Sequence, residues 1–281
     1  GENLFTVVAF NAANTLNARP VSGTFVSKID DGPRRVVLFT MGINEYAKSA
    51  DVDDLRFAVK DAEDFARAVT AAITQGDAKT QLKRIDLRDR DATREGVRRT
   101  FDELARGLKP SDIFIWFVAG HGMLDKNAQY GIIPHDWNGK PDPDALLSAG
   151  EILDASRKLP ALTQFFVFDT CHAGGLTSLA LGLYDARLAV LARNMGLHIF
   201  ASASATEEAI DGYQGNGLFT HTLLKGLSGA ADADGDKRVT VTELGRYASA
   251  ETARIARSAF RHAQQPSVMS YGRDWTLQSF K

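Results

Sequence analysis

The sequence predicts an α/β fold in which helices cover both faces of a mostly parallel sheet. Two observations lead to this prediction. From residue 34 onward, apolar runs alternate with segments whose apolar side chains recur at helical spacing. The runs 34–42 and 112–120 are almost continuously apolar, which is typical of strands buried on both faces. Such alternation implies parallel strands joined by helices, and the ligand sites of these sheets lie at the carboxyl ends of the strands.

The elements of this main domain follow a regular order. The expected helices 53–74 and 93–108 carry an apolar stripe, and Ser148 stands where it can cap the helix 148–159. Residues 130–137 predict a short hairpin arm. Residues 174–196 interrupt the alternation of strands and helices, and we interpret them as a loop between two halves of the sheet. The expected strands are 34–42, 81–87, 112–120, 162–170 and 196–204, and the expected helices are 53–74, 93–108, 148–159, 218–227 and 241–262.

The N-terminal 30 residues differ from the rest. Residues 4–10 and 20–27 predict two strands joined by an Asn-rich turn. An isolated hairpin is only marginally stable in water, so this pair is expected to pack on the main domain or to be the remnant of an upstream one. We therefore divide the chain into a hairpin, 1–30, and a main domain, 31–281, and expect an upstream domain or regulatory partner.

Composition excludes several function classes. The chain has 281 residues, of which 44% are hydrophobic and 24% are charged, and its net charge is −2. This balance gives no reason to expect nucleic acid or an anionic membrane as partner. No apolar run reaches the roughly 18–20 residues of a membrane-spanning helix. The single cysteine cannot form an internal disulfide, which favours a reducing, cytoplasmic location.

Two of the apolar strands end in reactive side chains. His121 follows the third strand in FVAGHGM, and Cys171 follows the fourth in FVFDTCHAGG, 50 residues later. A thiol needs a nearby base because it is only slightly ionised at neutral pH, and an imidazole can take its proton. Glycines after each residue leave the backbone open, so the N–H groups of Gly122 and Cys171 can stabilise an oxyanion. We therefore predict a cysteine nucleophile with a histidine base.

The simpler interpretation of each residue is structural. A lone cysteine is usually a small buried hydrophobe, and a lone histidine usually serves packing. The joint pattern at two strand ends, each followed by glycine, favours catalysis instead. The other five histidines lack such a setting, and one cysteine with scattered histidines gives no zinc-ligand spacing. The chemistry requires no cofactor.

These motifs resemble the caspase-like cysteine proteases. The resemblance rests on HG and DTCHAGG at the two strand ends, and on LRFAVKDAEDFARAV, HIFASASATEEA, GNGLFTHTLLKGL and the late QQP. The Asp-x-Cys-x-x-Gly pattern is closer to metacaspases and bacterial caspase-like proteins than to caspases. The resemblance implies a three-layer sandwich of the caspase type. Its large-subunit-like part is 31–173, its linker 174–196 and its small-subunit-like part 197–281.

The resemblance also implies a substrate class. In metacaspases, acids that match Asp61 and Asp169 line the pocket for the residue before the scissile bond. Asp169 lies two residues before Cys171, so its side chain is expected on the same face of the strand. Two carboxylates in such a pocket favour a cation, which predicts cleavage of protein substrates after Arg or Lys. The alternatives are a solvated helix residue for Asp61 and an acid that binds backbone N–H groups for Asp169.

Two further sets of residues come from the resemblance. Ser202 and Ser204 match the sheet edge that pairs with an extended substrate, with simple loop serines as the alternative. The linker 174–196 matches the segment at which relatives are cut, and Arg187 and Arg193 in it are candidate sites of self-cleavage.

The segment DADGDKRVTVTE, 232–243, resembles a calcium loop. Carboxylates stand at loop positions 1, 3, 5 and 12, where hard oxygen ligands suit Ca²⁺. Lys237 occupies the position at which a glycine normally makes the sharp turn. The alternative is an acidic turn that leads into the last helix. The predicted ligands are Asp232, Asp234, Asp236 and Glu243.

The sequence as a whole favours an endopeptidase with a Cys171–His121 dyad that forms a thioester acyl-enzyme. The alternative is a caspase-fold signalling or scaffold module that stays silent until an upstream domain activates it. Retention of both residues argues against a dead enzyme. A calcium sensor is a third class, but it does not explain the two strand-end turns.

Overall fold

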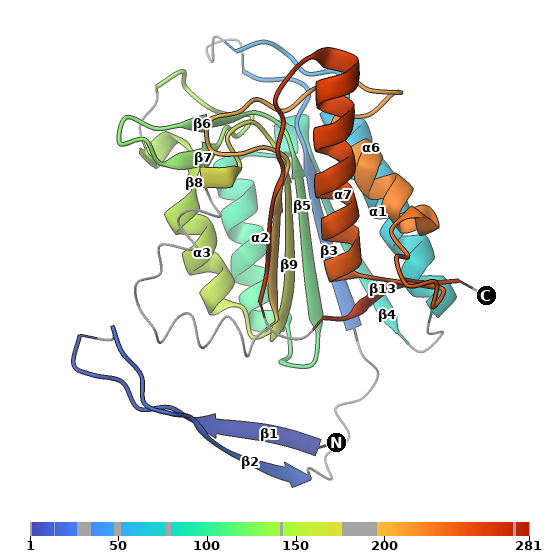
Figure 1. Cartoon of the computed structure of the whole chain (residues 1–281). Helices are drawn as coiled ribbons and strands as arrows, with labels where there is room; N and C mark the ends of the chain where they lie inside the picture. The colour runs from blue at the N-terminus through green and yellow to red at the C-terminus, as the bar shows by residue number, and fades with distance from the viewer. Residues whose placement is uncertain are drawn as a thin grey trace.

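The computed structural model confirms the α/β sandwich (Figure 1). It describes residues 2–13, 15–26, 35–47, 52–76, 80–140, 143–175, 196–271 and 274–280. The central sheet has six strands in the order β12-β10-β9-β5-β3-β4, and all neighbours are parallel except β12 and β10. Its strands are β3 (Arg35–Gly42), β4 (Gln81–Arg88), β5 (Ile113–Ala119), β9 (Thr163–Asp169), β10 (Leu197–Ala201) and β12 (Ser267–Ser270).

The register of the central strands aligns their carboxyl ends. Ala119 at the end of β5 lies opposite Gly42 of β3 on one side and Asp169 of β9 on the other. Neighbouring strands of a sheet lie about 4.8 Å apart. His121 and Cys171, each two residues beyond this row, therefore leave the sheet at the same edge from adjacent strands.

Helices cover both faces of the sheet (Figure 1). On one face, α1, α6 and α7 pack against side chains of the strands such as Leu38 and Phe117, in one core cluster. On the other face, α2 and α3 pack against Phe39 and Trp116 in a second cluster. The helices are α1 (Ala58–Gly76), α2 (Arg94–Gly107), α3 (Ala149–Lys158), α6 (Leu218–Lys225) and α7 (Val241–Ile255).

Side-chain caps fix where three helices begin. Thr93 accepts a hydrogen bond from the Gly96 N–H at the start of α2, and Thr240 forms a capping box at the start of α7. Ser148 caps α3 as predicted. The predicted helix 53–74 begins later, at Ala58; residues 52–57 are not helical, and the Leu55 N–H donates to the Asn44 carbonyl.

The last predicted helix, 241–262, is shorter than its apolar pattern suggests. α7 ends at Ile255, a π-helical turn covers Ala256–Phe260, and Arg261 adopts a left-handed conformation. A similar π-turn, Gly226–Ala230, follows α6. Short 3-10 helices occur at Asp89–Asp91 and Pro143–Ala145. The two π-turns follow α6 and α7, and the 3-10 helices lie in the connections after β4 and before β8.

Small strands flank the central sheet. β6 (Gly122–Leu124), β7 (Tyr130–Ile132) and β8 (Leu147–Ser148) form a three-stranded sheet beside the carboxyl edge. Of the predicted hairpin arm 130–137, only residues 130–132 are strand, and 133–137 form a turn and loop. β11 (Arg238–Thr240) pairs with β13 (Thr276–Ser279). The β6–β7 pair starts directly after His121.

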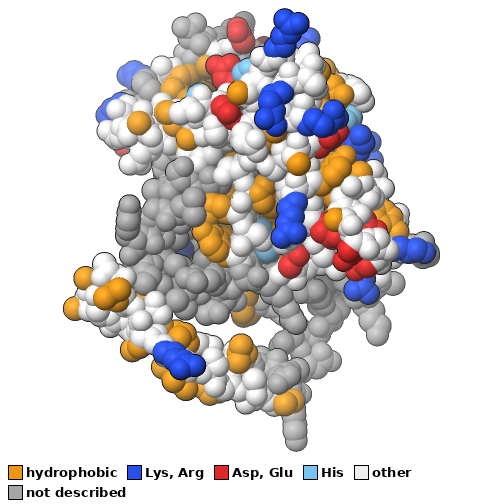
Figure 2. Space-filling model, in the orientation of Figure 1, with side chains coloured by type: hydrophobic (Ala, Val, Ile, Leu, Met, Phe, Trp, Pro, Cys, Tyr) orange, Lys and Arg blue, Asp and Glu red, His pale blue; other side chains and the backbone are white. Residues whose placement is uncertain are grey.

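The N-terminal residues form the predicted antiparallel hairpin, of β1 (Glu2–Val7) and β2 (Val21–Val26). Phe5, Val7, Val21 and Phe25 lie on one face of it, since their cross-strand partners share that face. All four are more than half exposed, and Figure 2 shows hydrophobic side chains along the hairpin surface. The described part of the main domain therefore does not cover this face.

Candidate active site

His121 is held by contacts from the loops that follow β3. Its backbone N–H donates to the Tyr46 hydroxyl at 2.7 Å, and the two rings lie 5.0 Å apart. Its Nε2 lies 2.8 Å from the carbonyl oxygen of Asp53. A carbonyl can only accept, so Nε2 carries the proton and Nδ1 of the neutral ring is left as the base.

Cys171 lies half-buried just beyond the end of β9. Burial raises the pKa of its thiol, and the nearby charges of Glu208, Asp169 and Asp211 raise it further. The backbone N–H of Ala209 opposes this increase by donating to the sulfur. The resting thiol is therefore protonated at neutral pH and depends on a base for its reactivity.

The two residues line one cavity of about 120 Å³ at the carboxyl edge of the sheet. The cavity also contains Asp61, Asp169 and Asp211, so three carboxyl groups surround the cysteine and the histidine. No hydrogen bond joins His121 to Cys171 among the contacts of these two described residues. Catalytic hydrogen bonds are often long in free enzymes and tighten when substrate binds.

Gly122 is buried and packs against the turn that carries the cysteine. It pairs with Ile132, and the Ile133 N–H donates to the His121 carbonyl at 3.0 Å. In this antiparallel register, the Gly122 N–H points away from β7. A β-carbon at Gly122 would collide with the Cys171 carbonyl oxygen, so only glycine fits this turn.

Asp61 and Asp169 meet at Gly217. A β-carbon on this glycine would lie 2.9 Å from Asp61 Oδ2 and 3.0 Å from Asp169 Oδ2. Asp61 is 3% exposed and accepts hydrogen bonds from the Gly217 N–H and the Asn216 amide, while Asp169 accepts from the N–H and hydroxyl of Thr220. The structure therefore brings together the two acids that the sequence predicted to share a pocket.

Burial perturbs both carboxyl groups. Burial and then the charge of Asp169 raise the pKa of Asp61 to about 8. Burial also raises the pKa of Asp169 to about 6, against the hydrogen bonds from Thr220. Two acids this close and this buried disfavour a second negative charge, and a cation in the cavity would relieve that cost.

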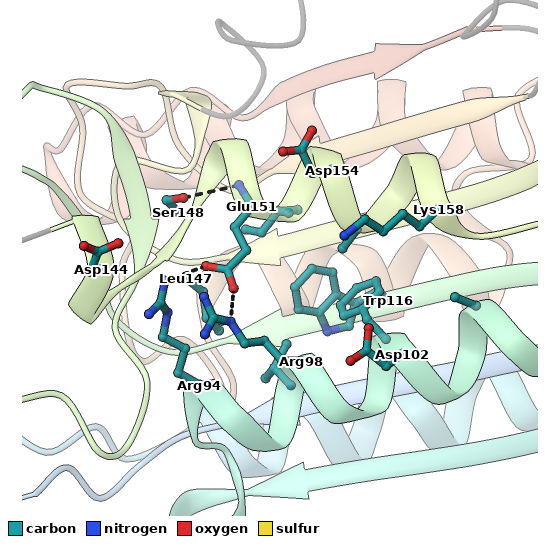
Figure 3. Close-up of a pocket in the computed structure, with 15 residues that line it drawn as sticks. Arg94, Arg98, Asp102, Trp116, Asp144, Leu147, Ser148, Glu151, Asp154 and Lys158 are labelled. Atoms are coloured by element: carbon teal, nitrogen blue, oxygen red, sulfur yellow. Dashed lines mark hydrogen bonds and ion pairs between the residues drawn. The ribbon is translucent and has the colours of Figure 1, made fainter.

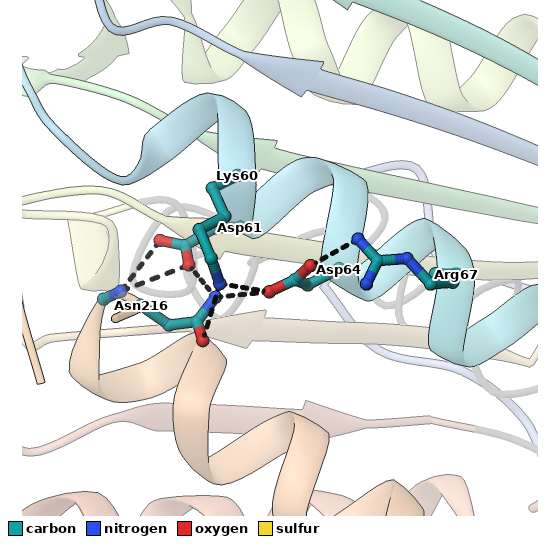
Figure 4. Close-up of polar contacts among 6 residues, drawn as sticks. Lys60, Asp61, Asp64, Arg67 and Asn216 are labelled. Carbon is teal, nitrogen blue, oxygen red and sulfur yellow. Dashed lines mark hydrogen bonds and ion pairs between the residues drawn. The ribbon is translucent and has the colours of Figure 1, made fainter. Parts of the chain in front are cut away.

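A polar network outside the cavity holds Asn216 in one orientation (Figure 4). Its Nδ2 donates to Asp61 at 2.7 Å and to Asp64 at 3.0 Å, and its Oδ1 accepts from Lys60 at 3.3 Å. Asp64 also forms ion pairs with Lys60 and Arg67. Asn216 therefore turns its N–H groups toward Asp61, which would otherwise lose a donor.

Asp211 is an acid of the cavity that sequence reasoning missed. It lies in the loop after β10, and the Arg56 N–H approaches its Oδ2 at 3.3 Å. No spacing relates it to Cys171, because the loop folds back over the sheet edge through tertiary bonds such as that from the Ile210 N–H to Gln264. The one feature of the sequence that could have indicated Asp211 is the acidic loop after β10, because β10 ends at the same edge of the sheet as β9.

His172 is a second residue with a role that the sequence did not reveal. It follows the cysteine in a left-handed conformation, with φ of 57°, which is uncommon outside glycine. Its ring Nδ1 lies 3.0 Å from the Ala205 carbonyl, and its backbone N–H donates to the Glu207 carbonyl. It thus ties the cysteine turn to the loop that carries Asp211.

The other predicted substrate residues lie elsewhere. Ser202 is fully buried and its hydroxyl donates to the Thr170 carbonyl at 2.9 Å, so it has no surface to offer a substrate. The backbone of Ser204 donates to Glu207. Neither lines the cavity, which is bordered by residues 209–211 instead. Arg187 and Arg193 lie outside the described residues.

The acidic loop brings together three of its four predicted ligands. Oxygen atoms of Asp232, Asp234 and Asp236 lie within 4.8 Å of one another, and Lys237 adopts the positive φ, 64°, that a glycine would supply. Glu243 instead completes the capping box of α7 and accepts from the Ala233 N–H. The backbone and donor set suit a hard cation, and Ca²⁺ binding stays a prediction.

A half-buried cysteine and a histidine thus lie at the carboxyl edge of this sandwich and line an acidic cavity. The family model described as the caspase domain matches residues 34–273. The chain belongs to this family of cysteine proteases.

Comparison with solved structures agrees on the fold. Protein GSU0716 from Geobacter sulfurreducens is similar, with a TM-score of 0.58 and 16% identity over 85% of this chain and 94% of that chain. No curated protein matches the sequence. Among the described helices, none is both long enough and apolar enough to cross a membrane.

Proposed function

We propose that the chain is an endopeptidase that cleaves proteins after Arg or Lys, with Cys171 as nucleophile and His121 as base. The observation that carries this proposal is the single cavity that contains both residues and three carboxyl groups. A thiol and an imidazole supply the reaction, and the acids supply the preference for a cationic side chain.

The first half of the reaction forms an acyl-enzyme. His121 Nδ1 takes the thiol proton, because the Asp53 carbonyl already holds the proton on Nε2. The sulfur attacks the scissile carbonyl carbon, and the N–H groups of Gly122 and Cys171 stabilise the resulting oxyanion. The imidazolium then protonates the leaving amine, and a thioester remains on Cys171.

Water completes the second half. His121 takes a proton from a water molecule that attacks the thioester carbonyl. The tetrahedral intermediate collapses, the thiolate leaves and regains its proton, and the carboxylic acid product departs. The same two residues thus serve as base and acid in turn, and no metal or cofactor enters a step.

The acidic cavity supports the choice of substrate. A guanidinium or ammonium group beside Asp61, Asp169 and Asp211 would form charge-assisted hydrogen bonds and offset their mutual repulsion. A substrate carboxylate would add a further negative charge to the same enclosed space. The arrangement therefore favours Arg or Lys, and disfavours Asp, before the scissile bond.

Self-cleavage and calcium are separate parts of the proposal. Cleavage at Arg187 or Arg193 would divide the chain, and fragments should form in wild-type but not in C171A protein. Calcium dependence would follow from binding at 232–243, and a chelator should lower the peptidase rate. Neither part is needed for the chemistry at Cys171.

A signalling module is the second candidate function. The observation that favours it is the resting thiol, whose pKa is raised and which lacks a hydrogen bond from His121 in the described site. Such a site would need a partner or an upstream domain to become active. This candidate predicts no turnover by the isolated chain.

Hydrolysis of fluorogenic peptides tests the proposal. The peptides end in Arg, Lys or Asp before the reporter, and each is incubated with wild-type and C171A protein, with calcium or with chelator. Release after Arg or Lys that disappears in C171A supports the proposal. Release after Asp contradicts the role of the acidic cavity, and no release under any condition favours the signalling module.

A further inference from the structure

One wall of the cavity at Cys171 belongs to no helix or strand. Residues 209–211 line the cavity one after another, and they lie in the irregular loop 202–211 that follows β10. The wide groove between α2 and α3 (Figure 3) does not contribute to this wall, because the groove and the cavity share no lining residue. Contacts from other segments of the chain must therefore hold the wall in place.

Most hydrogen bonds of this loop run to other segments of the described chain. At its start, the Ser202 hydroxyl donates to the Thr170 carbonyl at 2.9 Å. In its middle, the ring of His172 lies 3.0 Å from the Ala205 carbonyl. Both of these partners are sequence neighbours of Cys171, so the cysteine turn fixes the first half of the loop. Neither contact reaches the residues that line the cavity.

Gln264 supplies the contact at the wall itself. Its side chain is buried, with 1% exposed, and its Oε1 accepts a hydrogen bond from the Ile210 N–H at 3.0 Å. Ile210 is the middle one of the three residues of this loop that line the cavity. The Nε2 of Gln264 donates to the Ser202 carbonyl at 2.9 Å. One buried amide thus joins the first residue of the loop to the wall, although Gln264 does not line the cavity.

The bridge requires an acceptor and a donor at the end of one side chain. The Ile210 N–H can only donate and the Ser202 carbonyl can only accept, so these two partners fix the orientation of the amide. A buried backbone group that loses its partner costs free energy. Gln264 is the first residue of the late QQP motif, and this bridge gives the motif a physical role.

The wall that Gln264 holds carries two groups of the active site. The Ala209 N–H donates to the sulfur of Cys171, and Asp211 is one of the three carboxyl groups in the cavity. Ile210, to which Gln264 is bonded, stands between these two residues. A displacement of about 1 Å at the wall would weaken both contacts, because hydrogen bonds and catalytic geometry tolerate little movement.

We propose that Gln264 is a positioning residue of the active site, which holds the loop 202–211 so that Ala209 contacts the sulfur of Cys171 and Asp211 faces the substrate cation. The part that concerns Asp211 rests on the proposed function. The part that concerns the sulfur does not, because it describes the resting enzyme.

Alkylation of Cys171 by iodoacetamide gives a readout that needs no turnover. Q264M keeps the approximate length of the side chain and removes both hydrogen bonds. A weaker bond from the Ala209 N–H should raise the thiol pKa by at least about one. Tenfold less thiolate is then present at pH 8, and its greater nucleophilicity offsets about a factor of three. We therefore expect the alkylation rate to fall at least about threefold.

Q265M is the matched control. It makes the same change one residue later, where the side chain is exposed and donates to Ser249 of α7. The backbone N–H of Gln265, which donates to Glu207, is unchanged by this substitution. We expect Q265M to be alkylated at the wild-type rate.

Peptides that end in Arg or in citrulline test the part that concerns Asp211. Citrulline keeps the approximate shape of Arg without its charge. We expect Q264M and D211N each to reduce the preference for Arg, as a ratio of kcat/KM values, by at least about threefold. If Gln264 acts through Asp211, Q264M should reduce it no further in the D211N background.

Q264E decides the question if Q264M does not fold. A neutral carboxyl group has one donor and one acceptor, as the amide has, whereas a carboxylate can only accept. Burial at this position favours the neutral form. The ratio of the Q264E alkylation rate to the wild-type rate should therefore be near one at about pH 6 and fall as pH rises to about 9.

The proposal is overturned if folded Q264M is alkylated as fast as wild type or faster, or if Q265M slows as much as Q264M. With Q264M unfolded, a Q264E rate ratio that stays constant with pH overturns it. An unchanged preference for Arg in Q264M overturns the part that concerns Asp211. If wild-type protein cleaves no peptide, the proposed function fails, and the alkylation rates still decide the role of Gln264.

Discussion

Replacing Asp61 by Asn tests the acidic cavity in quantitative terms. The side chain is buried beside Asp169, and asparagine keeps its size while removing its charge. Losing one charge-assisted hydrogen bond to a substrate cation costs about 1.5–3 kcal/mol. With a pKa of about 8, however, Asp61 is mostly neutral at pH 7, and ionising it there costs about 1.4 kcal/mol.

The expected loss therefore depends on pH. For a peptide that ends in Arg, we predict that D61N lowers kcat/KM about ten- to a hundred-fold at pH 9, where Asp61 is ionised in the free enzyme, and at most about tenfold at pH 7. The assay is steady-state hydrolysis at both pH values. E63Q is the matched control, because Glu63 lies on α1, pairs with Arg88 and does not line the cavity. An equal loss at both pH values, or none at pH 9, would refute the reasoning.

Four further predictions follow from the same geometry. G122A should lose about a hundredfold or more of its activity, since its β-carbon would collide with the Cys171 carbonyl and displace the turn that carries the proposed oxyanion donors. H172N, which tolerates a left-handed backbone and can donate to the Ala205 carbonyl, should retain more activity than H172A, and the reverse order would contradict a positioning role. Alkylation of Cys171 by iodoacetamide should keep accelerating as pH rises above 8, because the thiol pKa is raised, whereas a plateau below pH 7 would indicate a resting ion pair with His121. Between about pH 4 and 8, folded Asp61 holds a proton that the unfolded chain has released, so stability should fall as pH rises, and D61N should flatten this slope in thermal unfolding.

The sequence predicted the strands of the sheet, and the positions of His121 and Cys171 at the ends of two of them, because both depend on local patterns. Continuous apolar runs identify strands that are buried on both faces, and β5 and β9 are such runs. The alternation with helices indicates that the strands are parallel, but it does not give their order in the sheet. His121 and Cys171 were found because each stands at the point where a run gives way to glycine.

The rest of the site depends on tertiary contacts that no local pattern records. Asp211 reaches the cavity because the loop after β10 folds back over the sheet edge, and the Asp53 carbonyl, which lies in the non-helical segment before α1, contacts His121. Ser202 was assigned to the substrate edge by resemblance, but it directly follows β10 and is fully buried. Backbone atoms and loop acids thus complete a site whose reactive side chains were visible in the sequence.

Covalent capture of the nucleophile tests the central claim most directly. Peptidyl acyloxymethyl ketones that end in Arg or in Asp are incubated with wild-type and H121A protein, and the adduct is located by peptide mass spectrometry. The account predicts one equivalent of the Arg reagent on Cys171, slower modification in H121A, and little reaction with the Asp reagent. Equal labelling by both reagents, or no adduct on a Cys171 that iodoacetamide still modifies, would contradict it.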